Sequence, residues 1–155
     1  MMKKIFIAMV VMVQLSMALV AETTYDGSSS MMTVGVLQGG GGLVGIDYEK
    51  LVSDRWGISG GIGVLSYGAA LHYHLAPSIS SHSITLTYWN QGFDPSNSMR
   101  YFGVSFVFRS AITRWTGQLG LASVLHVGDT VKANFETLNL AVPSVAALYS
   151  IGYMF

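Results

Sequence analysis

Apolar and polar residues alternate with a period of two along most of the chain, which predicts β-strands. In the last segment, ALYSIGYMF, one face is aromatic and aliphatic, while the other consists mostly of small or hydroxyl-bearing residues. The bulky face comprises Val145, Ala147, Tyr149, Ile151, Tyr153 and Phe155. We therefore expect a strand whose bulky face lies against an apolar medium.

The same alternation predicts eight strands in all. LVGIDYEKL, YGAALHYHL, YFGVSFVFR and WTGQLGLAS alternate cleanly, whereas MMTVGVLQ and WGISGGIGV do so less regularly. We place the strands at residues 31–38, 43–51, 56–64, 67–75, 83–90, 101–109, 114–126 and in a last segment that ends at Phe155. An alternative assignment, also of eight strands, joins residues 57–75 into one long strand and adds a strand at 131–140.

The smaller face of these strands favours the interior of a narrow barrel that lies in a membrane. That face carries mainly Gly, Ser, Thr and Ala, which suit an eight-stranded barrel whose lumen is just filled by side chains. A soluble barrel would place Lys, Glu and Asp on its outer face. The predicted fold is therefore an all-β, eight-stranded antiparallel up-and-down transmembrane β-barrel, with a soluble periplasmic barrel that binds a small apolar ligand as the alternative.

The composition agrees with this class. Only 10% of the residues are charged, against ~25% in a typical soluble domain, and there is no cysteine. The N-terminal residues 1–21 have the basic, apolar and small-residue regions of a secretory signal peptide, and their apolar run is short for a membrane-spanning helix. Residues 22–155 then form one barrel domain. Without Lys3 and Lys4 its net charge is about −2, which predicts no nucleic-acid partner.

The connections and the aromatic residues predict an orientation. External loops of such barrels are longer than periplasmic turns, so we place GGGG (39–42), QGFDPSNSM (91–99) and residues 127–143 outside. Aromatic side chains are enriched at membrane interfaces. Those expected at the periplasmic interface are Tyr48, Trp56, Tyr73, Phe108 and Trp115, followed by Tyr153 and Phe155, and those expected at the opposite interface are Tyr67, Tyr88 and Phe102.

These features together resemble the small outer-membrane β-barrel proteins of Gram-negative bacteria, of the OmpA/OmpX-like kind. The resemblance implies export through the Sec route, a cleaved signal peptide and insertion into outer-membrane lipid by the barrel assembly machinery. In that family the last strand carries the assembly signal, and the matching positions are Tyr149, Ile151, Tyr153 and Phe155. Such barrels serve as anchors, adhesins, narrow pores or lipid-modifying enzymes, and the partner of the external loops stays open.

The ionisable residues on the smaller face predict a polar network in the lumen. The alternation turns Asp47, Glu49, His72, His74, Arg109 and Gln118 inward, in the periplasmic half. A buried charge without a partner is costly, so we expect these groups to neutralise one another and to plug the barrel. A His/carboxylate metal site is chemically possible, but the sequence supplies no further ligands at diagnostic spacing, and we predict no metal.

Other chemistry is weakly supported. GGGGLVG and GISGGIG lack the GK[ST] of a phosphate loop, so we expect no nucleotide or other cofactor. Lipid A deacylases of similar size have a His followed two positions later by Ser. Here His82 is followed by Ile84 and His72 by His74, so that motif is absent. We expect a structural or interaction barrel first, a narrow small-solute pore second and a lipid-modifying enzyme third.

Overall fold

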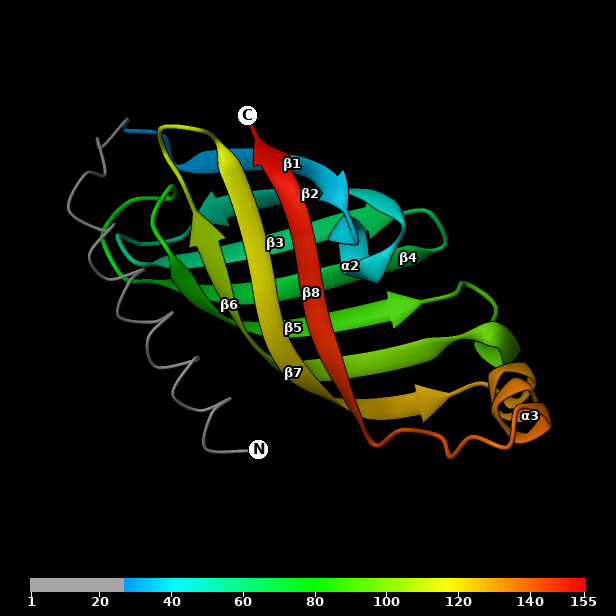
Figure 1. Ribbon diagram of the computed structural model, residues 1–155. Helices are drawn as coiled ribbons and strands as arrows, with labels where there is room; N and C mark the ends of the chain where they lie inside the picture. Colours follow the sequence, from blue (N-terminus) through cyan, green and yellow to red (C-terminus); the bar gives the residue numbers. More distant parts are fainter. Residues whose placement is uncertain (1–26) are drawn as a thin grey trace.

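The computed structural model describes residues 27–155, and the predicted signal peptide lies outside the described residues. Eight strands follow one another along the chain (Figure 1). They are β1 (Ser30–Val36), β2 (Val44–Leu51), β3 (Trp56–Gly63), β4 (Ser66–His74), β5 (Ser83–Gln91), β6 (Met99–Arg109), β7 (Trp115–Val127) and β8 (Val145–Met154). Three short helical segments lie between strands: α2 (Gln38–Gly41), η2 (Pro95–Asn97) and α3 (Asp129–Thr137).

The strands form one closed antiparallel barrel, in which each strand pairs with its neighbours in sequence and β8 returns to pair with β1. The predicted all-β, eight-stranded up-and-down barrel is thereby confirmed. The alternative assignment is wrong at both of its distinctive points. Val64 and Leu65 form a tight turn between β3 and β4, with Leu65 in the left-handed region, and residues 129–137 form a helix instead of a strand.

The two ends of the barrel differ in what they carry. Both ends of the described chain and the β2–β3, β4–β5 and β6–β7 turns lie at one end, which we call the terminal end (Figure 1). The other end, the loop end, carries α2, the β3–β4 turn, η2 and α3. None of the helices within residues 27–155 has the length and apolar character that a membrane-crossing helix needs.

Side chains alternate between the lumen and the outer surface as the pattern predicts. In β2, Ile46 and Tyr48 are exposed while Glu49 is buried. The less regular first segment follows the same rule, with Met32 outside and Thr33 inside. Small and hydroxyl-bearing residues dominate the lumen because an eight-stranded barrel leaves little room inside.

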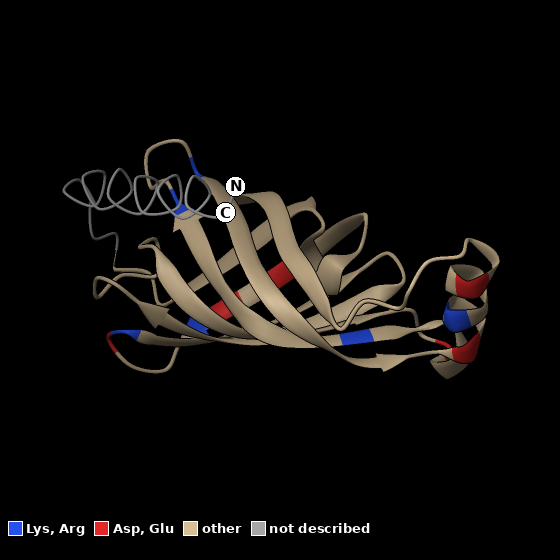
Figure 2. Cartoon of the chain, turned by 60° about the horizontal axis from the view of Figure 1, so that its bottom comes forward, with Lys and Arg blue, Asp and Glu red and all other residues tan. Residues whose placement is uncertain are grey.

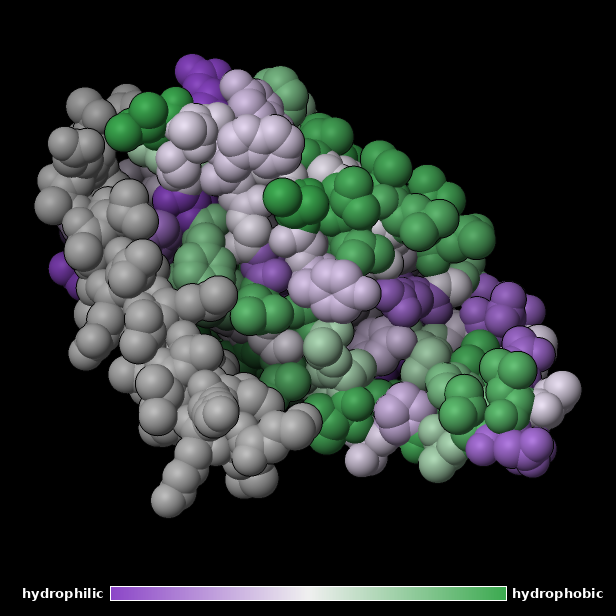
Figure 3. All heavy atoms as spheres, viewed as in Figure 1, coloured by the Kyte–Doolittle hydropathy of each residue, from purple (hydrophilic) through white to green (hydrophobic). Residues whose placement is uncertain are grey.

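The outer surface between the two ends is apolar. Exposed aliphatic and aromatic side chains occur on every strand, and Figure 3 shows apolar residues over much of the wall beside α2 and the β3–β4 turn. Charged residues are few along the strands and gather at α3 and at the turns of the terminal end (Figure 2). The wall thus has the opposite polarity to that of a soluble barrel.

Two local predictions about the loop end need correction. β1 ends at Val36 instead of residue 38, and the GGGG segment does not lie outside: Gln38, Gly39, Gly40 and Gly41 are all buried within the barrel. The predicted long loop at 127–143 contains the helix α3, none of whose residues is buried. The reversal into the lumen begins at Leu37, whose left-handed backbone (φ 58°) turns the chain away from the strand direction.

Candidate functional site

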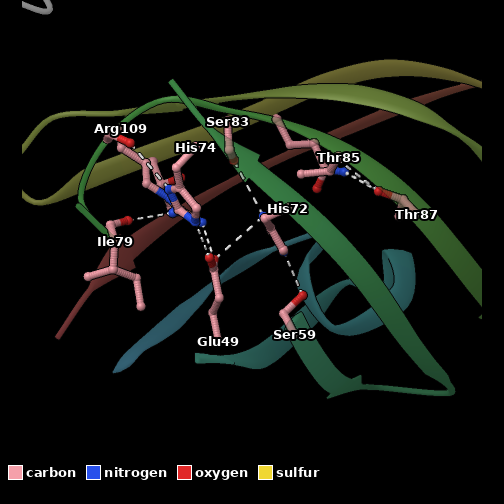
Figure 4. A network of polar contacts seen from close by, with 12 residues as sticks. Glu49, Ser59, His72, His74, Ile79, Ser83, Thr85, Thr87 and Arg109 are labelled. Carbon is pink, nitrogen blue, oxygen red and sulfur yellow. Dashed lines mark hydrogen bonds and ion pairs between the residues drawn. The ribbon is translucent and has the colours of Figure 1, made fainter. Parts of the chain in front are cut away.

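A charged network occupies the terminal half of the lumen (Figure 4). The Glu49 carboxylate on β2 forms an ion pair with Arg109 at the end of β6 and lies 2.7 Å from Nε2 of His74 on β4. Nδ1 of His72 lies 3.5 Å from the same carboxylate. All four residues are buried, with exposed fractions between 0% for His74 and 8% for Arg109. The structure therefore brings together four of the six residues predicted for the lumen network.

Arg109 also joins the network to the β4–β5 connection. Its Nη1 donates a hydrogen bond to the carbonyl of Ile79 at 2.5 Å, and its backbone N–H donates to Nδ1 of His82 at 2.9 Å. Ile79 is 1% exposed and packs with Met31 and Met154. The β4–β5 connection is therefore more than a turn between two strands, because it folds over the terminal end of the lumen and closes it.

Each histidine lies between a hydroxyl and the Glu49 carboxylate. Nε2 of His72 lies 2.8 Å from Oγ of Ser59, and Nδ1 of His74 lies 3.2 Å from Oγ of Ser81. Hydroxyl, imidazole and carboxylate in this order resemble the groups of a nucleophile–base–acid triad. However, Ser81 is 2% exposed and His74 fully buried, so the structure offers a substrate no access to that hydroxyl. These two serines could not be predicted from the sequence, since nothing in a strand pattern distinguishes a serine that hydrogen-bonds with a histidine from one that only fills space.

Gln118 belongs to a second, uncharged cluster. Its Nε2 donates to Oγ of Ser105 at 2.6 Å, and its Oε1 accepts from Ser150 at 3.4 Å. The Ser105 hydroxyl in turn hydrogen-bonds with Thr85 at 2.5 Å and Thr87 at 3.2 Å. The prediction that Gln118 meets the charged groups is wrong, because hydroxyls on β5 and β6 satisfy its amide first.

Asp47 is also separate from the charged network. Its Oδ2 accepts a hydrogen bond from the backbone N–H of Gly39 at 2.9 Å, so it anchors α2. Ser66 donates to the carbonyl of Gly39 at 2.6 Å, and Gln91 donates to that of Gly41 at 3.0 Å. Three strands thus hold the glycine segment, which we call the plug (residues 38–41), across the loop half of the lumen. The prediction that Asp47 joins Glu49 and Arg109 is wrong for this reason.

The plug fits because both it and the wall lack side chains. Gly40 has φ 84°, and a Cβ there would lie 2.0 Å from the carbonyl oxygen of Tyr67. On the wall, a Cβ on Gly68 would lie 2.9 Å from the Cα of Gly40. The glycines of the first loop and of β3 and β4 are therefore complementary. The two glycine-rich segments GGGGLVG and WGISGGIGV were therefore the feature of the sequence that could have indicated the plug.

The residues predicted for the membrane interfaces lie on the outer surface in contacting groups. Trp56 packs edge-on against Tyr73 with ring centroids 5.1 Å apart, and Trp115 against Tyr153 at 5.9 Å, all at the terminal end. Phe108 contacts Phe106 at 4.6 Å, and Tyr48 is 53% exposed. At the loop end Tyr67 stacks on Phe93. Of the predicted assembly-signal positions, Tyr149, Ile151 and Phe155 are exposed and Tyr153 is half-buried.

No other recognised site emerges from comparison. Within residues 27–155 no group of three or more His, Cys, Asp or Glu side chains is arranged to hold a metal ion. The chain matches no protein-family model, no curated protein and no solved structure.

Proposed function

We propose that this protein is an integral outer-membrane β-barrel with a plugged lumen, which acts as a structural or interaction protein. The observation that carries the proposal is the apolar outer wall of a closed barrel, flanked by aromatic groups at both ends. Barrels suit a bilayer because every strand can pair within the closed sheet, and aromatic rings prefer the two interfaces. In water the same wall would be a large exposed apolar patch.

The plugged interior supports an anchor or interaction role over a pore. The charged network and the β4–β5 connection fill the terminal half of the lumen, and the plug fills the loop half. In this proposal the parts free to meet a partner are the exposed α3 and η2 at the loop end, which would face the outside. Outer-membrane lipid surrounds the wall, and the barrel assembly machinery reads the strand with Tyr149, Ile151, Tyr153 and Phe155 during insertion.

A charge placed on the wall tests the proposal against the soluble alternative. Val104, in the middle of β6, is 51% exposed, and Ile112, in the β6–β7 turn, is 75% exposed. In a bilayer Val104→Arg should cost about 2–4 kcal/mol of folding free energy, whereas Ile112→Arg near the interface should cost at most about 1 kcal/mol. Both are measured by urea titration of the protein refolded into lipid vesicles.

The outcome separates the candidate functions. A soluble barrel should tolerate both arginines, should not fractionate with membranes, and should not shift on SDS gels upon heating, and this result would overturn the proposal. Steady conductance in planar bilayers would favour the small-solute pore. Altered lipid A in cells that express the protein would favour a lipid-modifying enzyme.

A further inference from the structure

The seam that closes the barrel is shorter than every other strand pairing. β1 and β8 pair over four residues, Thr33–Val36 with Met154–Ile151, whereas the other neighbouring strands pair over seven to eleven. The cause is local, because β1 stops at Val36 and the chain turns inward to form the plug, while β8 continues to Val145. Figure 1 shows β8 leaving β1 and running on towards the loop end beside β7.

The free edge of β8 has a definite polarity. Met32 and Phe155 exchange both backbone hydrogen bonds across the seam, and such pairs recur at every second residue of an antiparallel pair. The backbone groups of β8 directed at the seam therefore belong to Phe155, Tyr153 and Ile151, and then to Tyr149, Ala147 and Val145. Within the described residues no strand pairs with those last three on this side. Among residues 27–155, unpaired backbone N–H and C=O groups of β8 thus line the part of the β1–β8 seam that lies nearest the loop end.

A cavity with both polar and apolar lining lies behind this edge. Its volume is about 160 Å³, and its lining includes Leu37, Trp89, Tyr101, Ala147, Leu148 and Tyr149. Ala147 and Tyr149 belong to the free edge, Leu37 to the inward turn of β1, and Trp89 and Tyr101 to the far wall. The cavity therefore reaches from the seam into the lumen. The plug and the buried cluster of Trp89, Tyr101 and Leu148 bound it on the inside.

The lining defines the chemistry of a ligand. The Tyr101 hydroxyl donates to Oε1 of Gln91 at 3.0 Å, and the Gln91 amide donates to the carbonyl of Gly41. A ligand inside would meet ring faces and aliphatic carbon and, at the free edge of β8, the backbone groups of Ala147 and Tyr149 that are unpaired within the described residues. The chemistry suits a segment of hydrocarbon chain, with the polar edge of β8 beside its head.

We propose that the β1–β8 seam is a lateral opening through which the cavity takes the hydrocarbon chain of an amphiphile from the surrounding membrane. The proposal rests on the membrane location proposed above. The opening exists because one chain reversal both supplies the plug and withdraws β1 from its partner. Ala146 faces inward beside the cavity, and its small side chain leaves the space free.

Quenching of a single tryptophan tests the site. The chain has three tryptophans, and Trp56→Phe with Trp115→Phe leaves Trp89, which is 8% exposed and lines the cavity. In vesicles of phosphatidylcholine with brominated acyl chains, Trp89 emission should be largely lost. Ala146→Leu, whose side chain faces inward and packs against the Trp89 cluster, should fill the cavity and restore the emission. Ala69→Leu, a matched change at an exposed alanine on β4, should leave the quenching unchanged.

The controls separate this inference from the membrane proposal. If the protein inserts into the bilayer, the emission of a variant that keeps Trp115 as its single tryptophan should be quenched, since Trp115 lies on the outer wall. Quenching of Trp115 without quenching of Trp89 would overturn the lateral site and leave the barrel proposal intact, whereas no quenching of either would overturn the membrane location. If Ala146→Leu fails to fold, the smaller change Ala146→Val serves as the second blocking variant, and Trp89 quenching that survives a folded blocking variant also rejects the site.

A brominated fatty acid added to unbrominated vesicles identifies the source of the chain. Quenching of Trp89 by both probes assigns the cavity to hydrocarbon chains in general. Quenching by the phospholipid alone assigns it to membrane lipid, and quenching by the fatty acid alone to a free single-chain amphiphile. Each of these patterns, when abolished by Ala146→Leu, supports an opening at the seam.

Discussion

The two halves of the lumen are closed by different means. In the terminal half, charged side chains from β2, β4 and β6 meet on the Glu49 carboxylate beneath the β4–β5 connection. In the loop half, the backbone of four plug residues fills the space and is held by Asp47, Ser66 and Gln91. Closure by side chains leaves the strands regular, whereas closure by main chain requires one strand to end early, and it thereby opens the seam to β8.

The largest expected effect comes from removing the cation of the charged network. Arg109→Ala leaves Glu49 buried with no arginine partner, and breaking a buried pair in this way costs about 3–5 kcal/mol. The measurement is the free energy of unfolding of the refolded barrel, from urea titration monitored by tryptophan emission. Arg55→Ala is the control, since the side chain of this exposed arginine in the β2–β3 turn donates one hydrogen bond, to the carbonyl of Leu75, and its backbone bond with His74 is kept in the variant. Equal small losses for both arginines would show that the network does not stabilise the terminal half.

A second substitution, at the Glu49 carboxylate, should then recover part of that loss. In the Arg109→Ala background, Glu49→Gln removes the stranded charge while it keeps a group able to hydrogen-bond with His74. We expect a coupling energy of about 0.5–3 kcal/mol between the two positions, as found for residues in contact. The four unfolding free energies of the double-mutant cycle measure it. Strictly additive losses would contradict a direct Glu49–Arg109 interaction.

The same contrast explains what the sequence could predict. Because the alternation has a period of two, it identifies the residues that face inward. The eight strands, the apolar wall and the inward Glu49, His72, His74 and Arg109 therefore follow from the pattern. The pattern does not show how far along the lumen a side chain reaches, nor which neighbouring group forms its hydrogen bonds. Gln118 was therefore assigned to the wrong cluster, because its hydroxyl partners on β5 and β6 look like ordinary small lumen residues.

The plug could not be predicted from alternation for a different reason. A chain reversal into a barrel depends on left-handed backbone at Leu37 and at the glycines after it, and on glycines across the lumen that accept the close approach. Each of these features is individually compatible with an external loop. Asp47 was misplaced as a consequence, because its partner is a backbone N–H that the sequence appeared to put outside.

A methyl group in the plug tests the loop half. Gly40→Ala places a Cβ against the Tyr67 carbonyl at a position with φ 84°, so we expect a loss of about 1–3 kcal/mol in unfolding free energy. Gly60→Ala is the matched control, since its nearest neighbour to a new Cβ is 4.0 Å away and its φ is not positive. The urea titration used for Arg109 applies. Equal stability of the two alanine variants would mean that the plug does not occupy the lumen in solution.

The smallest effect is expected at the anchor of the plug, and it distinguishes the two halves most sharply. Asp47→Asn keeps an oxygen that can accept the Gly39 N–H but removes its charge, which should cost about 1 kcal/mol. No hydrogen bond or ion pair among residues 27–155 joins Asp47 to the charged network, so its loss should add to that of Arg109→Ala within about 0.5 kcal/mol. Combined with Gly40→Ala, by contrast, it should cost less than the sum, because the methyl group already displaces the plug that Asp47 holds. The reverse result, with Asp47 coupled to Arg109 and independent of Gly40, would return Asp47 to the charged network and leave the plug without its anchor.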